Sequence, residues 1–101
     1  MRKIGFVGAG NMAGALAKGL LATKRYRARD LWASDAESRQ LTRFVRAHGV
    51  GRAPDNGALV EESEIVVLAV KPQVMQAVLA EIRPHVTRRH LFVSIAAGIP
   101  T

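Results

Sequence analysis

A short apolar run that breaks into spaced glycines constrains this chain more than any other feature. Residues 4–7 are Ile-Gly-Phe-Val, and the next six, Gly8 to Ala13, match the pattern Gly-x-Gly-x-x-Ala. Gly8 can take the backbone angles of a tight turn, and Gly10 lets a pyrophosphate approach the main chain. A helix beginning near Asn11 would direct its unpaired N–H groups toward that pyrophosphate. The stretch predicts a strand, a dinucleotide-binding turn and a helix, with Ala13 packed between helix and strand.

Apolar segments of strand and helix character alternate along the rest of the chain. The expected strands are residues 4–7, 31–34, 50–53, 65–70 and 91–95, and the expected helices are residues 11–22, 36–48, 56–62 and 72–82. The run 65–70 is apolar, rich in β-branching and without polar alternation, which predicts a central position in the sheet. The alternation predicts one α/β domain over residues 1–101, with a Rossmann-like open parallel sheet, helices on both faces and the strand order 3-2-1-4-5.

Local signals predict where the helices end and which faces they bury. Gly49 is expected to end the second helix, Asp55 to cap the third and Pro72 to begin the fourth. Helical spacing predicts one apolar face of Met12, Ala15, Leu16, Gly19 and Leu20 in the first helix, and one of Met75, Val78, Leu79 and Ile82 in the fourth.

Composition restricts the class of protein. A chain of 101 residues with 49% hydrophobic content is expected to form one globular core. The absence of cysteine excludes a disulfide, a cysteine zinc site and a thiol nucleophile. No apolar run is long enough to cross a bilayer and no targeting peptide is recognised, so a cytoplasmic protein is expected.

The net charge of +7 raises the question of nucleic-acid binding. The basic residues form separate groups rather than one stripe: Lys24, Arg25, Arg27 and Arg29; Arg39, Arg43 and Arg46; Arg88 and Arg89. The few aromatic residues lie mostly at strand-like or core-like positions, which leaves no stacking platform for single strands. We expect a basic surface that attracts an anionic cofactor, and a nucleic-acid-binding domain is the third-ranked hypothesis.

The end of the second strand gives a mixed signal about the cofactor. An acidic residue there binds ribose hydroxyls, whereas hydroxyl or cationic groups accept a 2′-phosphate. Ser34 and the pair Arg39 and Arg43 favour the phosphate, while Asp35 would repel it unless its side chain points away. Ser34 and Asp35 fit equally well as caps of a helix beginning near Ala36.

Other polar residues give weaker evidence. Lys71 follows the run 65–70 at a strand end where α/β sheets place ligands, so ligand contact is favoured over a plain surface position. The histidines, His48, His85 and His90, flank basic residues or helix ends and are expected to be solvated, without a metal site. Ser94 lacks a paired base, which disfavours hydrolase chemistry.

Three segments are more specific together than the glycine pattern alone: residues 4–13 (IGFVGAGNMA), 69–73 (AVKPQ) and 93–99 (VSIAAGI). In order and spacing, the chain resembles the N-terminal domain of pyrroline-5-carboxylate reductases over almost its whole length. The resemblance implies an oxidoreductase that uses NADPH (NADP), or NADH as an alternative, to reduce 1-pyrroline-5-carboxylate to L-proline in proline biosynthesis.

The resemblance also implies which residues line the cofactor site. The pyrophosphate region is assigned to Phe6, Val7, Gly8, Ala9, Gly10, Asn11 and Met12, and the adenosine side to Ser34 and Asn56. The nicotinamide end is assigned to Ala69, Val70, Lys71 and Pro72, and residues 94–98, with Ala96 and Ala97, are expected to close the pocket. No catalytic group is assigned in this chain, although Lys71 is expected near the nicotinamide.

Two departures from the family pattern qualify these expectations. Asp35 and Ala36 stand where family members more often have neutral or proline-containing sequence. Family chains also continue into a helical domain that forms homo-oligomers and supplies much of the substrate pocket. This chain is therefore expected to be the cofactor-binding part of an enzyme, inactive or weakly active alone. The alternative is a stand-alone, non-catalytic dinucleotide-binding module.

Overall fold

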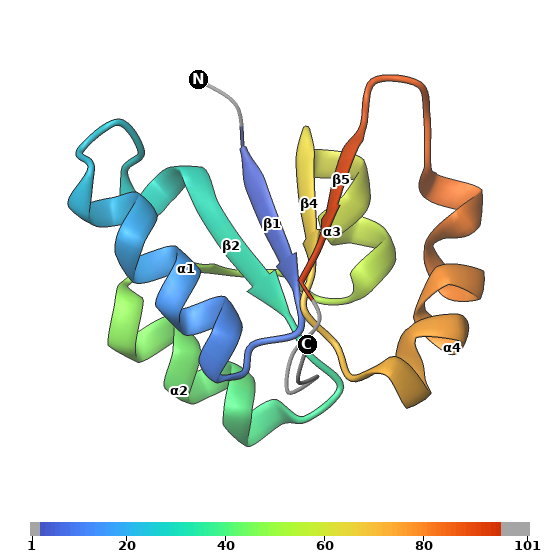
Figure 1. The fold of residues 1–101 in the computed structure, drawn as a ribbon, viewed down its shortest axis with the longest axis horizontal. Helices are drawn as coiled ribbons and strands as arrows, with labels where there is room; N and C mark the ends of the chain where they lie inside the picture. Colours follow the sequence, from blue (N-terminus) through green and yellow to red (C-terminus); the bar gives the residue numbers. More distant parts are fainter. Residues whose placement is uncertain (1–2, 96–101) are drawn as a thin grey trace.

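A five-stranded sheet forms the centre of the computed structural model, which describes residues 3–95 (Figure 1). Its strands are β1 (Ile4–Val7), β2 (Leu31–Ser34), β3 (Gly51–Arg52), β4 (Ile65–Leu68) and β5 (Leu91–Ser94). The helices are α1 (Asn11–Ala22), α2 (Ser38–His48), α3 (Asn56–Glu62) and α4 (Pro72–Ile82), with short 3-10 helices η1 (Ala28–Asp30) and η2 (Arg83–His85). The predicted alternation of strands and helices is confirmed.

The strands are parallel and lie in the order β3-β2-β1-β4-β5, as predicted. Val7 of β1 lies in register with Ser34 of β2 and Leu68 of β4. The chain therefore leaves β1, β2 and β4 at one level, and the three following connections lie together at the lower end of Figure 1. Because β2 and β4 lie on opposite sides of β1, this edge contains the switch point where open α/β sheets bind ligands.

The run 65–70 forms a shorter strand than predicted, in the interior position that the predicted strand order gives it. β1 occupies the middle of the sheet, and β4 lies between β1 and β5. β4 ends at Leu68, although the N–H of Ala69 still donates to the carbonyl of Val7 at 2.8 Å. The interior position of β4 agrees with the burial on both faces that a continuous apolar run indicates.

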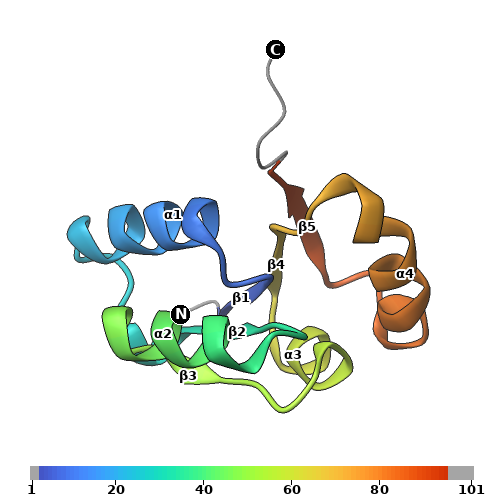
Figure 2. The same ribbon diagram turned by 90° about the horizontal axis from the view of Figure 1, so that it is seen from below.

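Two apolar cores lie on opposite faces of the sheet. Figure 2 shows α1 and α2 on one side and α3 and α4 on the other. The first core packs Phe6 against the α2 side chain Phe44, with ring centroids 5.8 Å apart. The second packs Val66 against Leu59, both fully buried. Within residues 3–95, no helix is both long and apolar enough to span a membrane.

The buried face of α1 matches the predicted one only in part, because Leu16 and Leu20 pack against the first core but the fully buried residues are alanines. Ala13 and Ala17 are 1% and 0% exposed, whereas Met12 is 43% exposed. A Cβ added at Gly19 would meet no atom within 4 Å, so Gly19 is not a contact position. Almost every side of α1 is apolar, so the spacing of apolar residues could not predict which side packs on the sheet. The side that does so carries the small residues Ala13 and Ala17. The prediction for Leu79 in α4 is also wrong, because that side chain is 43% exposed.

The predicted helix ends are confirmed. Gly49 follows α2 with a φ of 68°, a left-handed conformation that favours glycine. The Asp55 side chain accepts a hydrogen bond from the N–H of Ala58 at 2.7 Å and caps α3. Pro72 is the first residue of α4. Each short segment therefore begins or ends where its local chemistry specifies.

We expect Asp55→Ala to lower the free energy of unfolding by about 1 kcal/mol, because the Ala58 N–H loses its acceptor. That loss corresponds to a fall in Tm of roughly 4–8 °C. Asp55→Asn keeps an acceptor oxygen and should retain most of the stability. Thermal unfolding followed by circular dichroism measures both variants, and equal losses for alanine and asparagine would contradict the capping role.

Candidate dinucleotide-binding site

A cleft of about 630 Å³ lies at the carboxyl ends of β1, β2 and β4. Its walls come from the connections that follow these strands and from residues of the four helices α1 to α4. The lining residues are Val7, Gly8, Gly10, Asn11, Met12, Asp35, Ala36, Glu37, Gln40, Asn56, Ala69, Val70, Lys71, Val74 and Val78. Nine of the residues assigned to the cofactor from the sequence therefore line one cavity, as separate strand ends of a parallel sheet should.

Gly8 forms the tight turn at the floor of the cleft. Its φ is 101°, and its N–H donates to the carbonyl of Ser34 at 2.9 Å. A Cβ at this position would lie 2.6 Å from the carbonyl oxygen of Ala69. The turn predicted from the sequence is thus imposed both by backbone conformation and by the neighbouring β4–α4 connection.

Gly10 has a different role, because space is open around it. It is the N-cap residue of α1 with extended backbone angles, and no side chain caps the helix. The nearest atom to an added Cβ would be Gln40 Oε1 at 3.9 Å. The first turn of α1 therefore faces the cleft without a side-chain cap, which fits the binding of a phosphate group.

Asp35 points into the cleft rather than away from it. Its Oδ2 accepts hydrogen bonds from the N–H of Ala9 at 2.8 Å and from Gln40 Nε2 at 2.7 Å. Its Oδ1 accepts from the N–H of Glu37 at 2.7 Å. Helix α2 begins at Ser38 and has no side-chain cap, so the capping role considered for Asp35 is wrong. The carboxylate instead ties the end of β2 to the glycine turn.

Ser34 is buried at 2% exposure and does not line the cleft. Its Oγ donates a hydrogen bond to Asn56 Oδ1, and Asn56 Nδ2 donates to Glu81 Oε1 at 2.7 Å. Asn56 does line the cleft. Sequence reasoning missed Glu81, since nothing in its neighbours along the chain relates α4 to the end of β2.

The remaining assigned residues that the structure describes lie on the cleft wall, in the protein interior or, for Pro72, at the surface outside the cleft. Lys71 is exposed, lines the cleft and precedes Pro72, which begins α4 but does not line it. Phe6 and Ala9 are 0% and 5% exposed and lie in the first core. Ala96 and Ala97 lie outside the described residues.

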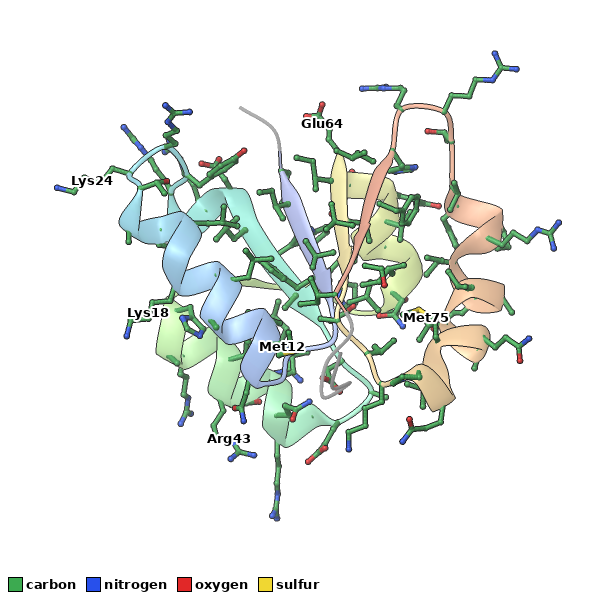
Figure 3. All side chains as sticks on the ribbon, in the orientation of Figure 1. Met12, Lys18, Lys24, Arg43, Glu64 and Met75 are labelled. Carbon is green, nitrogen blue, oxygen red and sulfur yellow. The ribbon has the colours of Figure 1, made fainter. Side chains whose placement is uncertain are left out.

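Arg39 and Arg43, the candidates for a 2′-phosphate, do not line this cleft. Arg43 lines a second cavity of about 600 Å³ between α1 and α2, together with Lys18 and His48. Figure 3 shows Lys18 and Arg43 on the outer side of these helices, away from α4. Arg39 lines neither cavity, whereas Gln40 lines both. The i, i+4 spacing placed both arginines on α2 but did not fix which cavity they approach.

The histidines are half-buried and contact protein atoms, so the prediction of freely solvated side chains is wrong. His85 Nδ1 lies 2.6 Å from Glu61 Oε2, and His90 Nε2 lies 2.7 Å from the carbonyl oxygen of Val60. His48 packs on Phe44 with ring centroids 4.9 Å apart. None of the three lines the first cleft, and these contacts join helices and loops.

Comparisons with known proteins identify relatives of this chain by sequence and by fold. Pyrroline-5-carboxylate reductase 3 of Rattus norvegicus is 44% identical over 98 residues, which cover 97% of this chain and 35% of that relative. The structure of a pyrroline-5-carboxylate reductase from Coxiella burnetii matches with a TM-score of 0.85 at 31% identity, over 96% of this chain and 36% of that chain. Plasmodium falciparum pyrroline carboxylate reductase with NADP bound matches with a TM-score of 0.79 at 28% identity, over 97% and 34%.

These matches confirm the Rossmann-like fold and the resemblance to pyrroline-5-carboxylate reductases. The chain spans about a third of the length of these relatives. A family model described as NADP oxidoreductase coenzyme F420-dependent matches residues 3–98. Since that match covers nearly the whole sequence, the chain belongs to the family of NADP oxidoreductases described as coenzyme F420-dependent.

Proposed function

We propose that this chain is the NAD(P)-binding domain of an enzyme that reduces 1-pyrroline-5-carboxylate to L-proline with NADPH, or alternatively with NADH. The observation that carries the proposal is the cleft in which the Gly8 turn meets the uncapped start of α1. The 44% identity to a pyrroline-5-carboxylate reductase supports the substrate. The NADP in the Plasmodium relative supports the cofactor.

Each wall of the cleft has a distinct part in this proposal. Gly8 and Gly10 would receive the pyrophosphate, because the first forms the turn and the second leaves space above it. Asn56 would contact the adenosine side, and Lys71 would lie at the nicotinamide end. The bound cofactor supplies a hydride for the C=N carbon of the substrate. The side chain of Val70 would help to exclude water at that end.

In this proposal the other wall of the substrate pocket, and the homo-oligomer contacts, would come from a helical domain like the one that the resemblance implies. A reductase must hold its substrate carbon against the nicotinamide and exclude water. The described residues provide the cofactor side of that arrangement. The cytoplasmic location and the homo-oligomeric assembly stay predictions.

The direct test is isothermal titration of the chain with NADPH and NADH in parallel, followed by an assay of NADPH oxidation that depends on 1-pyrroline-5-carboxylate. We expect saturable binding of at least one dinucleotide and little or no turnover by this chain alone. Absence of binding would contradict the proposal. Turnover at the level of the longer relatives would contradict the assignment of the substrate wall to another domain.

A stand-alone, non-catalytic dinucleotide-binding module is the second candidate. It is favoured by the composition of the cleft, where Asp35, Glu37 and Lys71 are the ionisable side chains among the described lining residues and no histidine is among them. The helical region of a relative can be added as a separate chain. If the protein binds dinucleotide but still shows no turnover after this addition, the result would favour the module over the enzyme. Restored turnover would favour the enzyme.

We expect Asp35→Asn to shift the cofactor preference toward NADPH. The variant keeps an oxygen to accept the Ala9 N–H but removes a negative charge that faces the cleft. NADPH carries a 2′-phosphate that NADH lacks, so the ratio of the NADPH Kd to the NADH Kd should fall about tenfold. Titrations with both dinucleotides measure the ratio.

Glu64→Gln is the matched control for Asp35→Asn. Glu64 is exposed and lies at the opposite end of the sheet from the cleft (Figure 3). The Glu64→Gln substitution removes the same charge far from the cleft, so it should leave the ratio of the NADPH Kd to the NADH Kd unchanged. An equal shift in both variants would mean that net charge, rather than the position of Asp35, determines the preference.

A further inference from the structure

Glu81 lies in the last turn of α4, outside the lining of the cleft, yet hydrogen bonds connect it to the cleft. Its Oε1 accepts a hydrogen bond from Asn56 Nδ2 at 2.7 Å. Asn56 Oδ1 in turn accepts a hydrogen bond from Ser34 Oγ. Glu81 therefore contacts a residue that lines the cleft without lining the cleft itself.

The orientation of the Asn56 amide depends on its partners. A primary amide offers an acceptor on one side and two donors on the other, and rotation by half a turn exchanges them. An ionised carboxylate only accepts hydrogen bonds, so Glu81 requires Nδ2 on its own side. Oδ1 must then face Ser34, whose hydroxyl group can donate.

This chain of hydrogen bonds ends at the glycine turn. The carbonyl of Ser34 accepts the N–H of Gly8 at 2.9 Å, and the Ser34 side chain is almost fully buried. Ser34 cannot easily change its conformation without disturbing that turn. The amide of Asn56 is therefore held between the Ser34 hydroxyl group, which can donate or accept, and the Glu81 carboxylate, which only accepts and so determines the orientation.

We propose that Glu81 is a positioning residue for dinucleotide binding, because it selects the orientation in which the Asn56 amide faces the cleft. In that orientation one Nδ2 hydrogen and one Oδ1 lone pair are left for a ligand. The proposal rests on the proposed dinucleotide site. It adds to that site a residue that touches no part of the cofactor and acts through Asn56.

Glu81→Lys gives the sharpest test, since its two consequences have opposite signs. A lysine side chain only donates hydrogen bonds, so the Asn56 amide should reverse and present the wrong groups to the ligand. We expect the Kd for NADPH and for NADH to rise about five- to tenfold. Electrostatics alone predicts the opposite, because the substitution adds positive charge near an anionic ligand.

Two variants serve as controls. Glu62→Lys makes the same change of charge at an exposed position of α3 that does not line the cleft, and should bind dinucleotide as tightly as the unmodified chain or slightly more tightly. Glu81→Gln keeps an acceptor oxygen and should bind within about twofold of the unmodified chain. A purely structural role for Glu81 would not distinguish lysine from glutamine in this way once thermal unfolding shows both variants folded.

A spectroscopic measurement on the ligand-free chain provides the second readout. The NMR signals of the Asn56 side-chain amide should move in Glu81→Lys, in which Nδ2 changes its partner, and stay near their original positions in Glu81→Gln. Unchanged signals in Glu81→Lys, or unchanged dinucleotide binding by that variant, would overturn the proposal. Binding that Gly10→Val abolishes but Glu81→Lys leaves intact would overturn this inference and leave the proposed site standing. Absence of binding by the unmodified chain would overturn both.

Discussion

Gly10→Val should weaken dinucleotide binding at least about 100-fold, equivalent to roughly 2.7 kcal/mol, while leaving the fold intact. The valine side chain would occupy the open space above the start of α1, where the pyrophosphate is expected to meet the main chain. The backbone of Gly10 is extended, with φ −85° and ψ −166°, so valine can adopt it. Titration with NADPH measures the loss.

The same substitution elsewhere on α1 provides the control. A Cβ at Gly19 meets no atom within 4 Å, and Gly19 lies outside the cleft. Gly19→Val should therefore bind NADPH like the unmodified chain. Gly10→Val should lower the free energy of unfolding by no more than about 1 kcal/mol, the scale of an altered N-cap. Equal binding by the two variants would exclude the start of α1 as the pyrophosphate site.

The order of strands and helices could be predicted because each signal is local. A turn or a helix end is specified by the backbone chemistry of a few residues. Examples are the glycine pattern after residues 4–7, the cap Asp55 and the helix-starting Pro72. Alternation of these segments then leaves few possible parallel topologies. The structure confirms the strand order and brings the expected strand ends to one cleft.

The missed features depend on contacts between distant segments. Asp35 is 26 residues from Ala9 in sequence, and only the folded turn brings its carboxylate to that N–H. Glu81 is 25 residues from Asn56, on a helix that meets α3 through the second core. The glycine at position 5 of β1 has a similar explanation, because a Cβ there would clash with the side chains of Ser63 and Leu59. The spacing of residues along the sequence does not predict which distant residues form such pairs.

Gly8 and Gly10 therefore have different roles, Gly8 in the stability of the turn and Gly10 in ligand binding. Measurements of the free energy of unfolding should distinguish them. Gly8→Ala should lower the free energy of unfolding by about 3 kcal/mol. A non-glycine residue with positive φ costs roughly 1–2 kcal/mol, and forcing a Cβ against packed atoms adds about 1–3 kcal/mol. The packed atom here is the Ala69 carbonyl oxygen, only 2.6 Å from the added Cβ, which belongs to the main chain beyond β4 and cannot rotate away.

Gly49→Ala isolates the cost of the backbone conformation from that of the contact. Gly49 also has a positive φ, 68°, but its nearest neighbour, Ala28 Cβ, would be 4.0 Å from an added Cβ. Its substitution should cost only about 1 kcal/mol. Since each kcal/mol lowers the Tm of a domain of this size by roughly 4–8 °C, calorimetry should resolve the two variants clearly. Equal losses would mean that the β4–α4 connection moves aside to admit the Cβ, and that positive φ alone explains the glycine at position 8.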